Sequence, residues 1–376
     1  MMTVRILHTA DLHLGANLAG FGELARERQR DFEKTFERIV TLAIKREADC
    51  LVVAGDLFDS NNVSAELVGR VQEGFARLAG RGIAVVLIPG THDHVVGATS
   101  IYRRYPFNGV HLLMEPVVTE PLCITLRGEE VWFYGFAYNS ASSNGALSSM
   151  ERRSAEGIHI GLLHGSLRGS PEWEHRHKDL PFAVADLAAL GLDYVALGHY
   201  HSFAPVEHDG QTIACYPGSP EGKRFGENGA RHVVITEVAK GRVTLEKVEV
   251  QSRTISELSI DASLFADQQP LVEELTRLAS PEVIARVRLV GIVEEPLDCA
   301  NMAGRLQGLF AWLDLVDETD LFDSSYVQRL EREDSIRGLF VRKVQERCAR
   351  AASDEERELH REALKLVFKR FAGRTE

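Results

Sequence analysis

The sequence of 376 residues has only five cysteines, and these offer neither a disulfide framework nor a zinc ribbon. Cys50, Cys123, Cys215, Cys299 and Cys348 are odd in number, far apart in the chain, and never arranged as a CxxC pair. Structural disulfides belong to oxidising compartments, so isolated cysteines of this kind indicate a reducing one. We therefore expect a cytoplasmic protein.

Long apolar runs are also missing. No stretch approaches the roughly 20 apolar residues that a membrane-spanning helix needs. The N-terminal MMTVRILH leads almost directly into a strand-like stretch, without the apolar region of a secretory leader. We expect no contact with a membrane. The 44% of hydrophobic and 26% of charged residues are ordinary globular values, which exclude a disordered, collagenous or coiled-coil chain.

The chain lacks the overall positive charge that would attract nucleic acids. Its 55 acidic residues against 43 Lys and Arg leave a net charge of −12, so any contact with a polyanion must be local. From Ile336 to the end, in contrast, eleven Lys or Arg stand against seven acidic residues, which gives this tail +4 and the rest −16. A charge break of this kind indicates a separate module.

What the chain does contain is an alternation of short apolar runs with amphipathic stretches, the pattern of an α/β fold. Strands are predicted at residues 4–7, 51–54, 84–88, 131–136, 158–163 and 194–197, and helices near 27–48, 64–80 and 182–190. Shorter β-like pieces at 212–216, 232–238 and 243–250 are expected to close the same domain with antiparallel strands.

The pattern changes after residue 252. A helix near 270–279, a strand at 283–290 and a helix at 301–314 predict a small second α/β domain, and two helices near 333–351 and 355–371 follow. At about 150 residues per domain, a chain of this length has room for two or three domains. The predicted domains are residues 1–252, 253–330 and 331–376.

Aspartate and histidine recur directly after successive predicted strands. These residues are Asp11, His13, Asp56, Asp59, His92 and Asp93, and later His164, His199 and His201. The carboxyl ends of strands in an open α/β sheet converge on one edge, so residues distant in sequence can share one site there. Any single one of the fourteen histidines is more readily interpreted as a surface or core residue. Five clusters at the same end of β-like runs are not readily explained in that way.

The residue types in these clusters suit metal ions. The spacing of Asp11 and His13 puts both on one side of an extended segment, so they can bind one ion together. His199 and His201 have the same spacing, although turn geometry can direct them at different ions. Carboxylates and imidazoles without thiolates suit Mn²⁺, Fe²⁺ or Zn²⁺ better than Mg²⁺ or Ca²⁺. Two such ions would bind a phosphoryl group and lower the pKa of a bound water.

Five short motifs resemble those of the calcineurin-like metallophosphoesterases in content and order. They are DLH at 11–13, GDLFD at 55–59, GTHD at 90–93, LLHG at 162–165 and GHYH at 198–201. The resemblance narrows to the DNA-repair exonuclease branch, with SbcD, Mre11 and YhaO-type proteins, through RxRDF at 28–32, YPGSP at 216–220 and FGE at 225–227. It implies an α/β fold in which a β-sandwich is flanked by helices, with a small C-terminal α/β capping domain and a helical tail.

The resemblance also implies a role for each site residue. Asp11, His13, Asp56 and His201 would bind one ion, and Asp56 would bridge to a second ion held by His164 and His199. His92 resembles the proton donor to the leaving group. Asp59 is placed like the acid that orients this histidine in related phosphatases, although Mre11 enzymes often carry a histidine there.

One position departs from the family pattern. Where relatives have asparagine, in GNHD or GNHE, this chain has Thr91. A hydroxyl is a shorter and weaker neutral ligand than an amide oxygen. Thr91 would bind the second ion directly, bind it through a water, or leave it loosely held, and we expect the second ion to be the more weakly bound.

Two other features each have a functional and a plain structural interpretation. Trp173 beside Arg176 and Lys178 would suit single-stranded nucleic acid, or belong to an ordinary surface loop. The two C-terminal helices are amphipathic, and their apolar stripes would pack on each other or on the small domain. The resemblance implies instead that they dock onto the coiled coil of an SbcC/Rad50-like ATPase.

The sequence thus predicts a phosphodiesterase with two divalent ions, Mn²⁺ first among them, that cleaves DNA and has a homodimer as a possible assembly. One alternative is a phosphoesterase acting on a small phosphoester, against which the long segment after residue 252 argues. The other is a non-catalytic DNA-binding or scaffold subunit whose metal site is weakened at Thr91.

Overall fold

The chain forms two compact units in the computed structural model, Met1–Ile255 and Ser256–Glu376. The structure describes residues 3–138, 145–172, 179–293, 295–321 and 324–372. Trp173, Arg176 and Lys178 lie outside these ranges, so their contact with nucleic acid stays a prediction. No helix within the described ranges is both long and apolar enough to cross a membrane.

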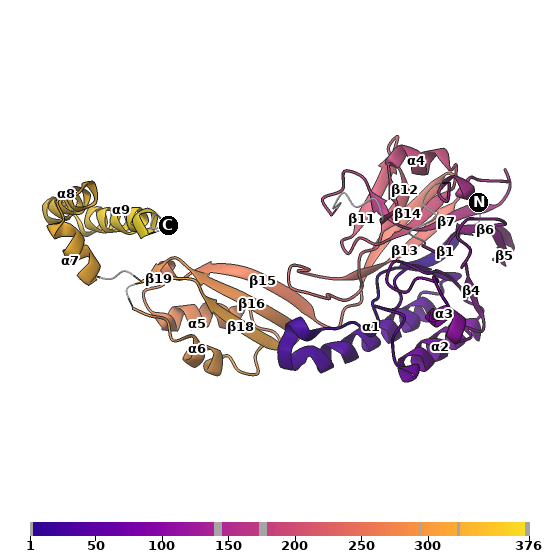
Figure 1. The fold of residues 1–376 in the computed structure, drawn as a ribbon, viewed down its shortest axis with the longest axis horizontal. Coiled ribbons are helices and arrows are strands. Elements are labelled where there is room, and N and C mark those ends of the chain that lie inside the picture. The colour runs from indigo at the N-terminus through magenta and orange to yellow at the C-terminus, as the bar shows by residue number, and fades with distance from the viewer. Residues whose placement is uncertain (1–2, 139–144, 173–178, 294, 322–323, 373–376) are drawn as a thin grey trace. The chain divides into compact units, whose positions relative to one another are not determined.

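Two six-stranded sheets make up the first unit (Figure 1). The first has the order β14 (Arg242–Glu249), β13 (His232–Ala239), β1 (Val4–Thr9), β2 (Cys50–Ala54), β3 (Ala84–Ile88) and β4 (Val110–Leu112). The second has the order β11 (Ala204–His208), β12 (Gln211–Tyr216), β10 (Tyr194–Gly198), β7 (Ile158–His164), β6 (Glu129–Gly135) and β5 (Leu122–Leu126). Val52 and Val86 of one sheet share a buried core with Ile160 and Ala196 of the other. The unit is therefore the predicted β-sandwich.

The central strands of each sheet are parallel, so they are joined by crossover connections, and most of these contain a helix. The first sheet is connected by α1 (Ala25–Lys45), α2 (Ala65–Ala79) and α3 (Ile101–Arg104), and α4 (Val184–Ala189) precedes β10. Both faces of β2 are covered, which is why its sequence is the continuous apolar run CLVVA with all five residues buried. Shorter elements are η1 (Ala19–Leu24), η2 (Ser148–Met150), β8 (Ser166–Leu167) and β9 (Pro181–Phe182).

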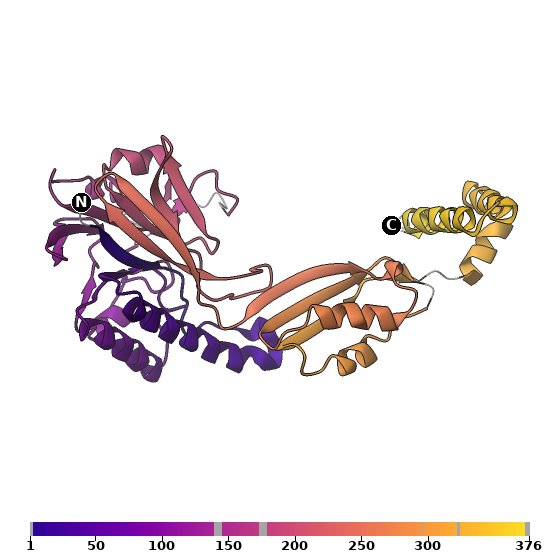
Figure 2. The same cartoon turned by 180° about the vertical axis from the view of Figure 1, so that it is seen from behind.

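Helices α1 and α2 lie side by side in both views (Figure 1, Figure 2). The apolar face of α1 includes Phe36 and Val40, both buried, and α2 is capped at its start by the side chain of Ser64. The two helices pack tightly at Gly74, where an added Cβ would lie only 2.6 Å from the Phe36 ring. This contact sets the distance between the helices that cover the first sheet.

The second unit begins with a three-stranded sheet in the order β15 (Thr254–Asp261), β16 (Val283–Val290) and β18 (Trp312–Asp317). Helices α5 (Gln268–Arg277) and α6 (Cys299–Arg305) contribute Leu275 and Met302 to its core. The expected helix over 301–314 is wrong in its second half, because the helix ends at Arg305 and β18 pairs parallel with β16. A two-stranded pair, β17 (Ile292–Val293) with β19 (Asp320–Leu321), completes this part.

The chain ends in α7 (Ser324–Arg332), α8 (Ile336–Arg350) and α9 (Asp354–Ala372). Leu330, Val344 and Leu364 come from the three helices and are buried in one cluster, so much of the apolar stripe serves packing among the helices. Ile336, in contrast, is 85% exposed. The predicted boundary near residue 330 stays a prediction.

Replacement of Gly74 by alanine should destabilise the first unit by about 1–3 kcal/mol, because the new methyl group would overlap the buried Phe36 ring. Gly69 on the same helix has no atom within 4 Å of an added Cβ, so Gly69→Ala should stabilise the helix by up to ~1 kcal/mol. Urea unfolding of the two variants measures both effects, and equal changes in stability would contradict the proposed helix contact.

Candidate metal centre

Residues at the end of five strands of the two sheets, or just after it, meet at one place in the first unit. Among the residues that the structure describes, three groups of side chains have ligand atoms within 4.8 Å of one another, namely Asp11–His13–His201, His13–Asp56–His92 and Asp11–Asp56–His164. Because the groups share His13, Asp11 and Asp56, they form one continuous cluster. The structure thus brings together most of the residues that the motifs predicted, from both sheets of the sandwich.

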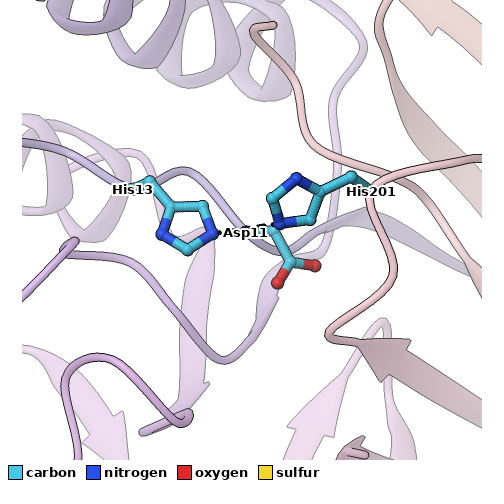
Figure 3. Close-up of side chains that lie close together, drawn as sticks. All are labelled: Asp11, His13 and His201. Atoms are coloured by element: carbon cyan, nitrogen blue, oxygen red, sulfur yellow. Dashed lines mark hydrogen bonds between the residues drawn. The ribbon is translucent and has the colours of Figure 1, made fainter. Parts of the chain in front are cut away.

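The first group contains one carboxylate and two imidazoles. Figure 3 shows one ring nitrogen of His13 pointing toward one of His201, with Asp11 beside them. Their Nε2 atoms are 3.2 Å apart. Both Asp11 and His13 are almost fully buried. Two imidazole nitrogens that point at the same place beside a carboxylate are a donor set that suits a divalent transition-metal ion.

Asp56 lies between this group and the opposite side of the cluster. Its Oδ2 atom is 3.9 Å from His13 Nε2 and 3.4 Å from His164 Nε2. Oδ2 also accepts a hydrogen bond of 3.2 Å from the hydroxyl of Thr91, and Oδ1 accepts one of 2.8 Å from the backbone of His92. A carboxylate in this position can contact an ion on either side of it.

The backbone is strained at this cluster. Among the described residues, eight other than glycine have a positive φ, and four of them are Asp11 (53°), His13 (45°), Asp56 (52°) and His199 (105°). L-residues rarely adopt this conformation, and it persists only where the surrounding structure enforces it. The ends of the strands are therefore held in the orientation that points these side chains into the cluster.

Two motif glycines are required by close packing. A Cβ at Gly55, which precedes Asp56, would lie 2.3 Å from His164 Nδ1. At Gly90, which precedes Thr91, it would lie 2.2 Å from Asp56 Oδ1. The GDLFD and GTHD loops can approach each other and β7 only because these positions carry no side chain.

The ring of His164 lies on the second side of the cluster, and its surroundings suit a cation. Its Nδ1 atom is 2.9 Å from the carbonyl oxygen of Ala54, which fixes the proton on that nitrogen. Its Nε2 atom is buried and makes no hydrogen bond of good geometry to the residues that the structure describes, its contact there being Asp56 Oδ2 at 3.4 Å. A buried imidazole nitrogen and a buried carboxylate that meet without a well-formed hydrogen bond are a pair that a metal ion between them would satisfy.

Burial and close contacts shift the acid–base properties of the cluster. Burial raises the pKa of Asp11 to about 6, and lowers the pKa of His13 to about 4 and that of His199 to about 3. Burial alone would lower the pKa of His164, but the carboxylate of Asp56 raises it to about 10. Burial would likewise raise the pKa of Asp56, yet His164 and His13 hold it well below its usual value. The buried carboxylates thus favour a positive charge beside them.

His92 lies at the exposed edge of the cluster, with 42% of its side chain accessible. Its Nδ1 atom is 2.9 Å from the backbone oxygen of Asp59 and 3.7 Å from the carboxylate of that residue. The carboxylate lies closer to the ring of His13, at 3.1 Å from Nδ1. Asp59 therefore contacts both histidines, and its predicted role in orienting His92 stays a prediction.

His199 belongs to none of the three groups. Its ring centroid is 5.2 Å from that of His164, and its backbone N–H donates to both oxygens of Asp11, at 2.9 and 3.1 Å. Through this bond, the loop after β10 is tied to the loop after β1. The predicted role of His199 as a ligand of the second ion stays a prediction.

Three residues had no role assigned from the sequence. The carboxylate of Glu227 accepts a hydrogen bond from the ring of His201, and the ammonium group of Lys223 donates one to the carboxylate of Asp59. Asp93 is fully buried and accepts the backbone N–H groups of Gly90 and Phe58, which ties the GTHD and GDLFD loops together. Glu227 and Asp93 stand inside quoted motifs, which was the available signal, but no sequence pattern pointed to Lys223.

Comparison with known proteins agrees with this geometry. The family model described as calcineurin-like phosphoesterase matches residues 4–203, and the chain belongs to this family. It is accordingly a metal-dependent phosphodiesterase that binds divalent ions, and the fold predicted from the motifs is confirmed.

Three curated relatives are similar in sequence. The uncharacterized metallophosphoesterase YhaO of Bacillus subtilis is 27% identical over 97% of this chain and 97% of its own length. The SbcD component of the nuclease SbcCD of the same organism is 29% identical over 63% of this chain and 67% of its own. The DNA double-strand break repair protein Mre11 of Sulfurisphaera tokodaii is 30% identical over 59% and 55%, respectively. The predicted resemblance to these branches is confirmed.

Replacement of Thr91 by asparagine should strengthen the binding of one of two ions. The hydroxyl of Thr91 touches Asp56, and an amide oxygen there would reach further into the side that His164 occupies. Adding a ligand of this kind typically changes metal affinity by about 10- to 100-fold. Calorimetric titration with Mn²⁺ should therefore give unequal sites in the wild type and more equal sites in Thr91→Asn.

Thr91→Val, which keeps the shape of the side chain and removes the hydroxyl, is the matched control and should not strengthen either site. Two equally tight sites in the wild type, or an Asn variant that titrates like the wild type, would show that the threonine does not weaken the site.

Proposed function

We propose that the protein hydrolyses DNA phosphodiester bonds with two divalent metal ions. The observation that carries this proposal is the position of Asp56 Oδ2 between His13 and His164, at 3.9 and 3.4 Å from their Nε2 atoms. The names of two relatives, a nuclease component and a DNA double-strand break repair protein, support DNA as the substrate.

In this proposal Asp11, His13, Asp56 and His201 hold the first ion, and Asp56, Thr91, His164 and His199 hold the second. When bound, the ions would polarise the phosphoryl oxygen and lower the pKa of a water molecule. Mn²⁺ is the first choice for this donor set, with Fe²⁺ or Zn²⁺ as alternatives.

Hydrolysis also requires that the leaving oxygen be protonated, and the residue at the exposed edge of the cluster can do this. His92 is accessible to a substrate, and its Nδ1 atom is bonded to the backbone oxygen of Asp59. If Nδ1 carries the proton of the neutral ring, a second proton on Nε2 can pass to the leaving oxygen. His92 is thus proposed as the general acid, with Asp59 as the residue that orients it.

Two alternatives are less well supported. A small phosphoester substrate would not require the second unit, which falls within the 97% of the chain that is similar to YhaO. A scaffold protein without activity would not need four ligands held in strained backbone conformations. The proposal also includes a cytoplasmic location and leaves a homodimer as a possible assembly.

Labelled DNA and a chromogenic phosphodiester, each assayed with and without Mn²⁺, test this function. The wild type should cleave both. His92→Ala should keep its metal content while its turnover falls by roughly 10²- to 10⁴-fold, the usual cost of losing a general acid. Asp56→Ala should lose metal and activity together.

Cleavage of the chromogenic diester alone would favour the small-substrate alternative, and no cleavage of either would favour the scaffold. If His92→Ala loses its metal, His92 is a ligand, which its place in the His13–Asp56–His92 group also allows.

We further propose that the terminal helices bind the coiled coil of an SbcC/Rad50-like ATPase. Part of their apolar surface is used in packing, but Ile336, Leu339 and Leu359 stay exposed. The tail from Ile336 onward also carries an excess of positive charge. An exposed apolar set on basic helices suits an acidic coiled-coil surface.

Removal of all residues after 321 should leave activity on the chromogenic diester unchanged, because every proposed ligand lies in the first unit. The cut precedes α7 because Leu330 of this helix packs against α8 and α9, so the three helices are removed together. In the full chain, Ile336→Glu with Leu359→Glu should abolish capture of a coiled-coil ATPase segment without lowering the melting temperature. Capture that survives this double substitution would place the docking surface elsewhere.

A further inference from the structure

The segment of residues 221–227 begins deep in the first unit. The carboxylate of Glu221, 1% exposed, accepts the backbone N–H of Ser252 at 2.7 Å and forms an ion pair of 2.8 Å with Arg28. Arg28 is itself fully buried and donates to the carbonyl oxygen of Gly222 at 2.7 Å. The start of the segment is therefore fixed to α1 and to the chain that follows β14.

The rest of the segment reaches the metal centre. Glu227 accepts a hydrogen bond of 2.8 Å from His201 Nδ1 with one oxygen, and one of 2.8 Å from the backbone N–H of Lys223 with the other. The Nζ atom of Lys223 donates to the carboxylate of Asp59, which lies 3.1 Å from His13 Nδ1, and Nζ itself lies 3.4 Å from the same ring nitrogen. One short segment thus connects to the outer ring nitrogens of two histidines.

These contacts determine what the inner nitrogens can do. A neutral imidazole that donates from Nδ1 keeps a lone pair on Nε2, and an acceptor at Nδ1 also fixes the plane of the ring. In His13 and His201 the two Nε2 atoms face each other at 3.2 Å, where they can bind one ion. Glu227 is mostly buried, so little water competes for its bond to His201.

We propose that the 221–227 segment is a positioning element for the first ion. Glu227 orients His201 directly, Lys223 orients His13 both through Asp59 and by its own contact with the ring, and Arg28 holds the segment in place. These are positioning residues, since each acts on the ion through another side chain. The inference rests on the proposed two-ion site. It also explains why the RxRDF and FGE motifs, which are distant in sequence, occur together, because both position the same segment.

The test is calorimetric titration of the full chain with Mn²⁺. In Glu227→Gln a single carbonyl oxygen must replace two carboxylate oxygens, so the affinity of the tighter site should fall by about 10- to 100-fold. The weaker site should keep its affinity. Lys223→Met should have the same kind of effect, and Lys223→Arg, which keeps the cation, should restore most of the lost affinity.

Glu207→Gln is the matched control, because Glu207 is an exposed residue of β11 and its substitution removes the same charge. It should titrate like the wild type. The melting temperature of each variant without metal shows whether the fold is retained.

Wild-type affinities in both Glu227→Gln and Lys223→Met would overturn the inference. A parallel loss at both sites together with a lower melting temperature in the absence of metal would also overturn it, because the segment would then be structural only. A wild type that binds no Mn²⁺ would overturn the two-ion proposal itself, and this inference with it.

Discussion

The carboxylate of Asp56 is the group on which the rest of the centre depends. It is 2% exposed, and its two oxygens contact Thr91, the backbone of His92 and the ring of His164. A buried carboxylate is stable only if positive charge or hydrogen-bond donors surround it. The strand ends that supply those donors must therefore stay in register, and the glycines that permit their close approach are as necessary as the side chains of the cluster.

The sequence was sufficient where location follows from topology. Asp11, Asp56 and Thr91 each follow a strand, and strands that run parallel in one sheet end on the same edge, so their meeting could be predicted without coordinates. It was insufficient where a loop crosses the fold. Nothing in the local pattern around Lys223 indicates that its side chain ends beside Asp59, because the path of that loop is set by a buried arginine almost 200 residues earlier.

The spacing of apolar residues also led to a wrong prediction in the second unit. Met302, Leu306 and Phe310 recur every fourth residue, which favours a helix that continues to residue 314, and all three are indeed buried. The chain nevertheless leaves the helix after Arg305 and extends at Trp312, because pairing with β16 satisfies the backbone there. A short apolar run is compatible with the periodicity of a helix and with that of a strand, and here the pairing with a neighbouring strand decides between the two.

The strained conformations at Asp11, His13 and Asp56 limit how this centre could be re-engineered for another metal. Aspartate, asparagine and histidine tolerate a left-handed backbone better than other residues, apart from glycine. A cysteine or glutamate introduced to change metal preference would have to adopt the same φ, at a cost of order 1–3 kcal/mol in addition to any change in ligand chemistry. The backbone thus restricts the residue types that can be used at these positions. An exchange of aspartate for asparagine changes the metal preference at the lowest cost in conformational free energy.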